Sequence, residues 1–325
     1  MSRAGNFPAH VQPTTVDGGR PHRPRLILLF FPFSVLLFCL SACRSRPAVI
    51  NLALLGDINL GRGVSPAPDS LAFLAPELKA ADIAFANLES PLGRGNGSVA
   101  PYGGYDLCAP AERANLLAAW GFDLLSIANN HRFDCSPDGP SETAAILRAA
   151  DIYPVASGLD SVYWNIPGLK LAFLAYDDVA SPLDEKAAVQ EIWQAHAYGA
   201  LVVVSVHWGA EYQAAPTERQ KTLANRFAQA GAVLIVGSHP HVLQTAEWIP
   251  TGEGKTLVLY SLGNALFDQP GLPDTRRSAL VVVRLDAGGV RSVRAVPFVI
   301  DTAGSRVVAP DAAAAALIHN DLHIP

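Results

Sequence analysis

The chain has 325 residues, of which 50% are hydrophobic and 16% are charged, and its formal net charge is −5. This composition allows one large domain or two small ones with a sizeable core. It excludes disorder for most of the chain, because charge is low and aliphatic content is high. The negative charge argues against a nucleic-acid partner, which requires a positive footprint.

The first 43 residues have the composition of an export signal. Three arginines, at positions 20, 23 and 25, precede the uncharged run LILLFFPFSVLLFCL, and small Ser41 and Ala42 stand before Cys43. A basic region, an apolar region and small residues at a cleavage point predict a signal peptide. The ending Leu-Ser-Ala-Cys resembles a bacterial lipobox, in which the cysteine is lipidated and becomes the mature N-terminus. Loss of the preceding four arginines and one aspartate would change the net charge from −5 to −8.

An uncleaved membrane anchor or an ordinary signal peptide are the alternatives for this segment. The stretch from Leu26 to Cys43 is close to the lower length limit for a membrane span, and Pro32 interrupts it. Every alternative places the folded part outside the cytoplasm, and a lipidated Cys43 would tether it to a membrane surface. In an oxidising compartment Cys108 and Cys135 could form a disulfide, although two thiols alone do not establish one.

From residue 48 onward, short apolar runs alternate with segments of helical periodicity, the pattern of an α/β protein. Several runs are apolar throughout, which is typical of strands buried on both faces. The sequence predicts strands at 49–56, 81–88, 122–128, 169–176, 200–206, 232–237 and 256–262, and a hairpin within 278–300.

Helices are expected between these runs. Segments 109–121, 141–151 and 217–231 have helical periodicity and suitable boundary residues, such as Thr217 before the third and Gly231 after it. Residues 90–108 are rich in Gly and Pro and predict a long surface loop. The main domain is therefore expected over 48–300, and the tail over 301–325 contains a candidate helix at 311–322.

Metal-ligand residue types recur directly after the apolar runs. The residues at these strand ends are Asp57, Glu89, Asn129 to His131, His207, His239, His241 and Asn264. In open α/β sheets, ligands bind outside the carboxyl ends of the strands. Carboxylate, imidazole and amide groups together suit Zn, Mn, Fe or similar divalent ions. Glu89 could bridge two ions, and such a pair can clamp a phosphoryl-like centre and generate hydroxide near neutral pH.

Six segments in this order resemble the CapA family of poly-γ-glutamate capsule synthesis proteins. They are GDINLGRGV, ANLESPLG, GFDLLSIANNHRFD, VVVSVHWGAEY, GAVLIVGSHPHVLQ and LVLYSLGNALFD, and the resemblance covers roughly residues 50–300. It implies a four-layer α/β/β/α sandwich of the calcineurin-like metallophosphoesterase type.

The resemblance also implies roles for individual residues. The positions that match metal ligands are Asp57, Glu89, Asn130, His207, His239 and His241. His131 matches the position that protonates the leaving oxygen in the phosphoesterase superfamily. Glu211 fits a role in supporting the ligands or contacting the substrate, and Arg62 and Asn87 could bind an anionic group.

Two departures from the superfamily pattern affect these expectations. Phosphoesterases usually begin with Asp-x-His, whereas Asn59 stands at the position of that histidine, so one metal site could be weaker or differently filled. Relatives often carry Gly soon after the Asp of the Asn-Asn-His segment, whereas Cys135 and Ser136 follow Asp134 here.

Three functions remain open from the sequence. One is a surface-anchored protein for making, anchoring or exporting an anionic capsule polymer such as poly-γ-glutamate, alone or with other capsule-synthesis proteins. The second is a metal-dependent hydrolase acting on an extracytoplasmic phosphoester, nucleotide or amide, and the two are compatible. The third is a protein that binds an anionic polymer without turnover, an alternative that the missing histidine at position 59 favours.

Overall fold

The computed structural model describes residues 14–17, 48–94, 105–159, 161–269 and 271–324. The predicted signal segment 1–43, including Cys43, lies outside the described residues except for β1 (Thr14–Asp17), which pairs in parallel with β8. None of the helices in the described ranges is both long enough and apolar enough to span a membrane.

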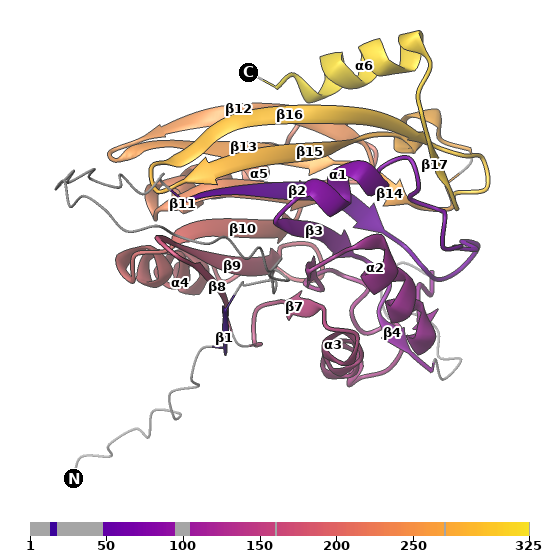
Figure 1. Cartoon of the computed structure of the whole chain (residues 1–325), viewed down its shortest axis with the longest axis horizontal. Helices are drawn as coiled ribbons and strands as arrows, with labels where there is room; N and C mark the ends of the chain where they lie inside the picture. Colours follow the sequence, from indigo (N-terminus) through magenta and orange to yellow (C-terminus); the bar gives the residue numbers. More distant parts are fainter. Residues whose placement is uncertain (1–13, 18–47, 95–104, 160, 270, 325) are drawn as a thin grey trace, which may run out of the picture.

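Two large mixed sheets form the centre of the molecule (Figure 1). Sheet A has seven strands in the order β1, β8 (Val162–Ile166), β9 (Leu169–Asp177), β10 (Leu201–His207), β11 (Ala232–Ser238), β13 (Gly254–Leu262) and β12 (Leu243–Thr251). Sheet B has eight strands, with the path β17 (Val307–Val308), β16 (Gly289–Ile300), β15 (Arg277–Asp286), β2 (Val49–Ile58), β3 (Ile83–Leu88), β6 (Leu124–Ser126) and β7 (Tyr153–Val155), while β14 (Asn264–Leu266) pairs with β2. The short strands β4 (Leu92–Gly93) and β5 (Ala109–Pro110) pair separately.

The inner faces of the two sheets pack against each other. Along β2, alternate residues Ile50, Leu52 and Leu54 enter the core between the sheets, whereas Ala53 and Leu55 enter the core beneath the helices on the outer face. This alternation is the two-residue period of a strand buried on both sides. Phe85 of sheet B stacks on Phe173 of sheet A, with ring centroids 6.1 Å apart.

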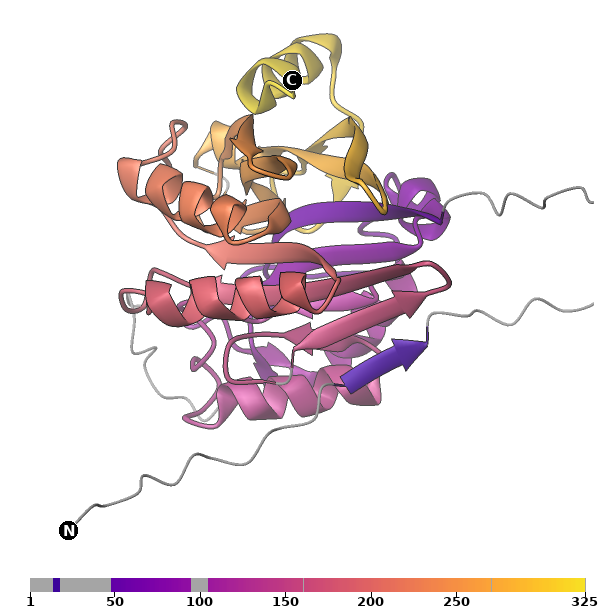
Figure 2. The same cartoon turned by 90° about the vertical axis from the view of Figure 1, so that its left-hand side faces the viewer.

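Helices cover both outer faces (Figures 1 and 2). The helices α1 (Ala75–Ala80), α2 (Ala114–Trp120) and α3 (Gly139–Ala149) pack on sheet B, and the short 3-10 helix η1 (Ala111–Arg113) directly precedes α2. The helices α4 (Glu185–Ala197) and α5 (Glu218–Gln229) pack on sheet A. The layers are therefore helix, sheet, sheet, helix, which confirms the predicted four-layer α/β/β/α sandwich.

The last helix, α6 (Ala312–Leu322), lies at one end of the sandwich against β12 and β16 (Figure 1). Its buried residues Ile318 and Leu322 join the core between the two sheets. The remaining described helix is the 3-10 turn η2 (Pro273–Arg276). The Asp311 side chain accepts a hydrogen bond from the backbone N–H of Ala314, which explains why α6 starts where it does.

The chain passes from one sheet to the other at Gly263, between β13 and β14. Asp57 N–H donates to the Gly263 carbonyl at 2.9 Å. A Cβ at Gly56 would lie 1.9 Å from the same carbonyl oxygen, so only glycine permits this approach. This contact brings the carboxyl ends of strands from both sheets to one place.

Candidate metal centre

The six predicted ligand residues lie together at the carboxyl ends of strands from both sheets. Sheet B supplies Asp57 at the end of β2, Glu89 just after β3 and Asn130 after β6. Sheet A supplies His207 at the end of β10, and His239 and His241 after β11. All six residues are buried. The structure thus brings together residues that are up to 184 positions apart in the chain.

Short distances join these side chains across the two sheets. His241 Nδ1 lies 3.5 Å from Asp57 Oδ2, and His241 Nε2 lies 3.5 Å from Glu89 Oε1. His207 Nε2 lies 2.8 Å from Asn130 Oδ1. In Asp57, Glu89 and His207, one ligand atom from each side chain lies within 4.8 Å of the others. Oxygen and nitrogen donors therefore converge as the binding of a divalent ion requires.

The backbone around Pro240 is unusual and is held from two sides. His239 has φ 94° and His241 has φ 59°, a region that residues other than glycine rarely adopt. Such conformations cost roughly 1–3 kcal/mol each and cluster at functional sites. The His239 N–H donates to Asp57 Oδ2 at 3.1 Å, and His241 Nδ1 lies 2.9 Å from Asn264 Oδ1. These contacts aim both imidazoles at the centre.

Several buried polar atoms of the centre have no hydrogen-bond partner among the described residues. They are both carboxylate oxygens of Glu89 and Nδ1 of His239. Glu89 is 0% exposed, and a carboxylate without hydrogen bonds in such a place carries a large desolvation cost. A divalent cation would satisfy these atoms, so the residues present fit a metal.

Burial and mutual interaction shift the acidities within the cluster. Burial raises the pKa of Glu89 to about 8, assisted by the neighbouring Asp57 carboxylate. Burial, together with nearby His241, lowers the pKa of His239 to about 4. Burial opposes protonation of His241, but the Glu89 and Asp57 carboxylates outweigh it and raise the pKa of His241 to about 9. His239 therefore stays neutral near pH 7, whereas the Glu89–His241 pair retains a proton that a bound metal would displace.

His131 lies at the edge of the cluster and is held by an acidic side chain. Its Nδ1 lies 2.8 Å from Asp134 Oδ2, and its Nε2 lies 3.9 Å from Glu89 Oε1. Burial opposes protonation, but the hydrogen bond with Asp134 and the charge of Glu89 raise the pKa of His131. Asp134 also accepts the Leu107 N–H at 2.9 Å. The orientation of His131 thus depends on a residue that the sequence pattern did not assign to the site.

A disulfide between Cys108 and Cys135 lies directly beside this pair. It links the segment that carries Leu107 to the segment that carries Asp134. The disulfide and the Leu107–Asp134 hydrogen bond together fix residues 105–108 against the His131 turn.

The two residues expected to bind an anionic group already form hydrogen bonds with other side chains of the protein. Arg62 Nε donates to Asp268 Oδ2 at 2.7 Å, and its guanidinium lies 5.0 Å from the ring centroid of Tyr105. Asn87 Nδ2 donates to Asp57 Oδ1 at 2.8 Å, so Asn87 orients a ligand carboxylate. Arg62 lines a cavity of about 350 Å³ that opens on His131, Glu211, Tyr212 and His241.

Asn59 stands at the position of the usual histidine, but its side chain is bonded elsewhere and does not take the place of that histidine as a candidate ligand. Its Oδ1 accepts the Gly61 N–H at 2.8 Å, and its Nδ2 donates to Asp268 Oδ1 at 3.1 Å. Both polar atoms of this buried side chain are thus used in holding the loop that carries Arg62.

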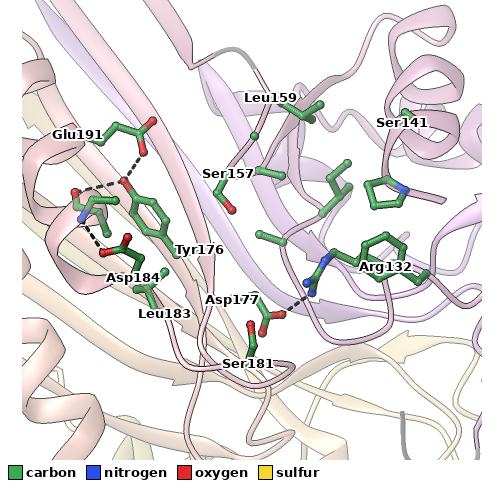
Figure 3. Close-up of a pocket in the computed structure, with 18 of the residues that line it drawn as sticks. Arg132, Ser141, Ser157, Leu159, Tyr176, Asp177, Ser181, Leu183, Asp184 and Glu191 are labelled. Carbon is green, nitrogen blue, oxygen red and sulfur yellow. Dashed lines mark hydrogen bonds and ion pairs between the residues drawn. The ribbon is translucent and has the colours of Figure 1, made fainter. Parts of the chain in front are cut away.

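A second cavity, of about 580 Å³, lies next to the cluster between the starts of α3 and α4 (Figure 3). Arg132, which follows His131, donates to Asp177 at the end of β9 in this cavity. Tyr176 donates to Glu191 on the opposite wall at 2.9 Å. Most of the remaining wall is apolar, including Leu159 and Leu183. Asp177 extends the strand-end pattern to a further strand of sheet A.

The fold and the cluster together define an α/β sandwich of metallophosphoesterase type, with candidate ligand residues at the joined ends of its two sheets. The chain belongs to the family described as "Bacterial capsule synthesis protein PGA_cap", which it matches over residues 51–269. This result confirms the resemblance seen in the sequence.

Known proteins with similar sequences carry related names. The chain is 30% identical to the PGA biosynthesis protein CapA of Bacillus subtilis (strain 168), over 81% of this chain and 75% of that protein. It is 31% identical to the capsule biosynthesis protein CapA of Bacillus anthracis, over 80% of this chain and 69% of that protein. Among solved structures, a hypothetical protein from Thermus thermophilus superposes with a TM-score of 0.50 at 16% identity, covering 76% of this chain and 98% of that one. The last similarity concerns the fold alone.

Proposed function

We propose that this chain is an exported, metal-dependent protein of capsule-polymer biosynthesis, acting in the synthesis, anchoring or export of an anionic polymer such as poly-γ-glutamate. The names of the two Bacillus relatives support the capsule role. The observation that supports the metal dependence is the buried Glu89 carboxylate, whose two oxygens have no hydrogen-bond partner among the described residues although imidazoles of His131, His207 and His241 lie near it.

The ligand set of the proposed centre is Asp57, Glu89, Asn130, His207, His239 and His241. When bound there, a divalent pair such as Mn, Fe or Zn would polarise an anionic substrate oxygen and supply a nucleophile at neutral pH. The chain itself provides the proton donor, since Asp134 holds His131 with Nε2 facing Glu89. His131 would transfer its Nε2 proton to a leaving oxygen bound in the adjoining cavity.

We propose a membrane-tethered location outside the cytoplasm, with the leader cleaved before Cys43 and that cysteine lipidated. The leader composition supports this location, and the disulfide between Cys108 and Cys135 is of the kind that persists in oxidising compartments. A Cys43→Ala variant should then leave the membrane fraction or accumulate unprocessed. A wild-type protein that fractionates with the cytosol would contradict this location.

Gene deletion with complementation tests the function. In a host that makes a surface polymer, deletion should reduce the polymer on the cell surface, and the wild-type gene should restore it. The Glu89→Gln variant should fail, whereas Glu253→Gln, which removes an exposed carboxylate far from the centre, should succeed. Full restoration by Glu89→Gln would show that the centre is not needed.

A second candidate is hydrolysis of a phosphoester or another anionic ester, and the His131–Asp134 pair favours it. A histidine held by a carboxylate beside the candidate ligands can act as a general acid towards a leaving oxygen. Purified protein loaded with Mn²⁺ should cleave a generic aryl phosphate or diester. Tight polymer binding without cleavage across several metals would instead support the role as a binding protein.

A further inference from the structure

The metal centre lacks the histidine that usually completes its first sequence motif. Asn59 stands at that position, but its amide oxygen and nitrogen are bound to Gly61 and Asp268 at 2.8 and 3.1 Å. Releasing the oxygen to a metal would leave a buried N–H of Gly61 without its partner and would undo the loop that carries Arg62. One of the two metal sites therefore needs a ligand from elsewhere in the chain.

We propose that Glu211 is that ligand, an assignment that rests on the metal centre of the proposed function. One ligand atom from each of Glu211, His239 and His241 lies within 4.8 Å of the other two. His239 Nδ1 is buried and has no hydrogen-bond partner among the described residues, which points to an ion at this side of the cluster. The Glu211 carboxylate thus lies close enough to both imidazoles to share an ion with them.

The loop that carries Glu211 is built to hold this position. The Tyr212 N–H donates at 2.8 Å to the carbonyl of Pro240, the residue between the two histidines. Tyr212 itself has φ 63°, so the chain turns sharply just after Glu211. This backbone bond ties the residue that follows Glu211 to the turn that carries both imidazoles.

A buried amide pair fixes the rest of the same loop. Gln244, which is 0% exposed, donates to the carbonyls of Gln213 and Ala215 at 2.8 and 3.3 Å. Gln220 donates to the Gln244 side chain at 2.8 Å. Two fully buried glutamine side chains therefore set the path of this loop.

Replacing an imidazole by a carboxylate changes the chemistry of the centre. Oxygen ligands favour harder ions such as Mn²⁺ and Mg²⁺, whereas imidazole suits Zn²⁺ and Cu²⁺. Three carboxylates, from Asp57, Glu89 and Glu211, also leave a loaded dinuclear centre less positive than two would. We therefore expect the site next to Glu211 to bind Mn²⁺ in preference to Zn²⁺, relative to a site completed by histidine.

Titration calorimetry and elemental analysis of the purified protein with Mn²⁺ alone test the assignment. The wild type should bind two ions per chain. Glu211→Gln keeps the side-chain shape and should lose one ion or weaken its affinity by more than about 100-fold, because even residues outside the ligand shell contribute 10–100-fold. The other ion should bind as in the wild type, and the exposed control Glu253→Gln should bind both.

A second variant, Glu211→His, should keep two ions and shift the preference from Mn²⁺ towards Zn²⁺. Two Mn²⁺ ions bound to Glu211→Gln with unchanged affinity would refute the ligand assignment alone. A wild type that binds no Mn²⁺ or Zn²⁺ would refute the metal centre of the proposed function as well. Neither outcome depends on knowing the substrate.

Discussion

Removal of the disulfide between Cys108 and Cys135 should lower stability by an amount set by the length of chain that it closes. The two residues are 27 positions apart. The loop-closure relation for that separation gives a stabilisation of about 3.5 kcal/mol at 25 °C. In a domain of this size about 2 °C of Tm corresponds to each kcal/mol, so Tm should fall by about 7 °C.

Differential scanning calorimetry of the mature protein would measure this fall in the Cys108→Ser/Cys135→Ser double variant. Wild type treated with a reductant should show the same fall, and reductant should not shift the double variant further. Metal content should stay unchanged, because neither cysteine is a proposed ligand. A double variant that melts within about 2 °C of the oxidised wild type would refute the loop-closure reasoning.

Three further predictions concern the centre. Glu89→Gln should weaken Mn²⁺ binding by more than about 100-fold in calorimetry; wild-type affinity would contradict the ligand role. The pKa values of Glu89 and His241 are raised to about 8 and 9, so Mn²⁺ affinity should increase as pH rises from about 6 to about 9. Calorimetric titration in buffers of different ionisation enthalpy should detect the protons released on binding. An Mn²⁺ affinity that does not depend on pH would contradict this prediction. His131→Ala should retain metal but lose any esterase turnover by roughly 10²–10⁴-fold, and Asp134→Asn should shift the pH profile; unaltered turnover in His131→Ala would remove His131 from the chemistry.

The strands that the sequence predicts best are those with continuous apolar runs. The runs at 169–176, 200–206 and 232–237 correspond to β9, β10 and β11 to within a residue or two at each end. These strands are central in sheet A, so both faces are buried and nearly every position is apolar. Edge strands have a weaker signal: β12 is exposed at Glu247 and contains Pro250, and the sequence did not predict it.

The helix α4 also escaped prediction, for a different reason. It buries only Ala188, Ile192 and Ala195 along 13 residues, so its apolar stripe is narrow. Its N-terminus is marked by Asp184, whose side chain accepts the Ala187 N–H, but a single aspartate after Leu183 is a weak signal alone.

In the candidate site, too, the positions of some residues could be predicted from local sequence, whereas their tertiary contacts could not. Strand-end positions identify Asp57 and His207, because ligands in α/β proteins bind outside the carboxyl ends of strands, although the two residues end strands of different sheets. The partners of the nearby groups could not be predicted, since Asp268 reaches Asn59 and Arg62 over more than 200 residues. Asp134 lies only three residues from His131. No sequence rule, however, distinguishes an aspartate that orients a histidine from an aspartate in an ordinary turn.

The crossing at Gly263 makes the centre a joint between two halves of the molecule. Of the six ligands predicted from the sequence, three follow strands of one sheet and three follow strands of the other, and the chain itself changes sheets at the same point. An ion bound there would cross-link the two sheets and resist their sliding or separation. Amide hydrogen exchange in β2 and β11 should therefore slow together on metal loading, and chelation should open the molecule to proteases at this seam.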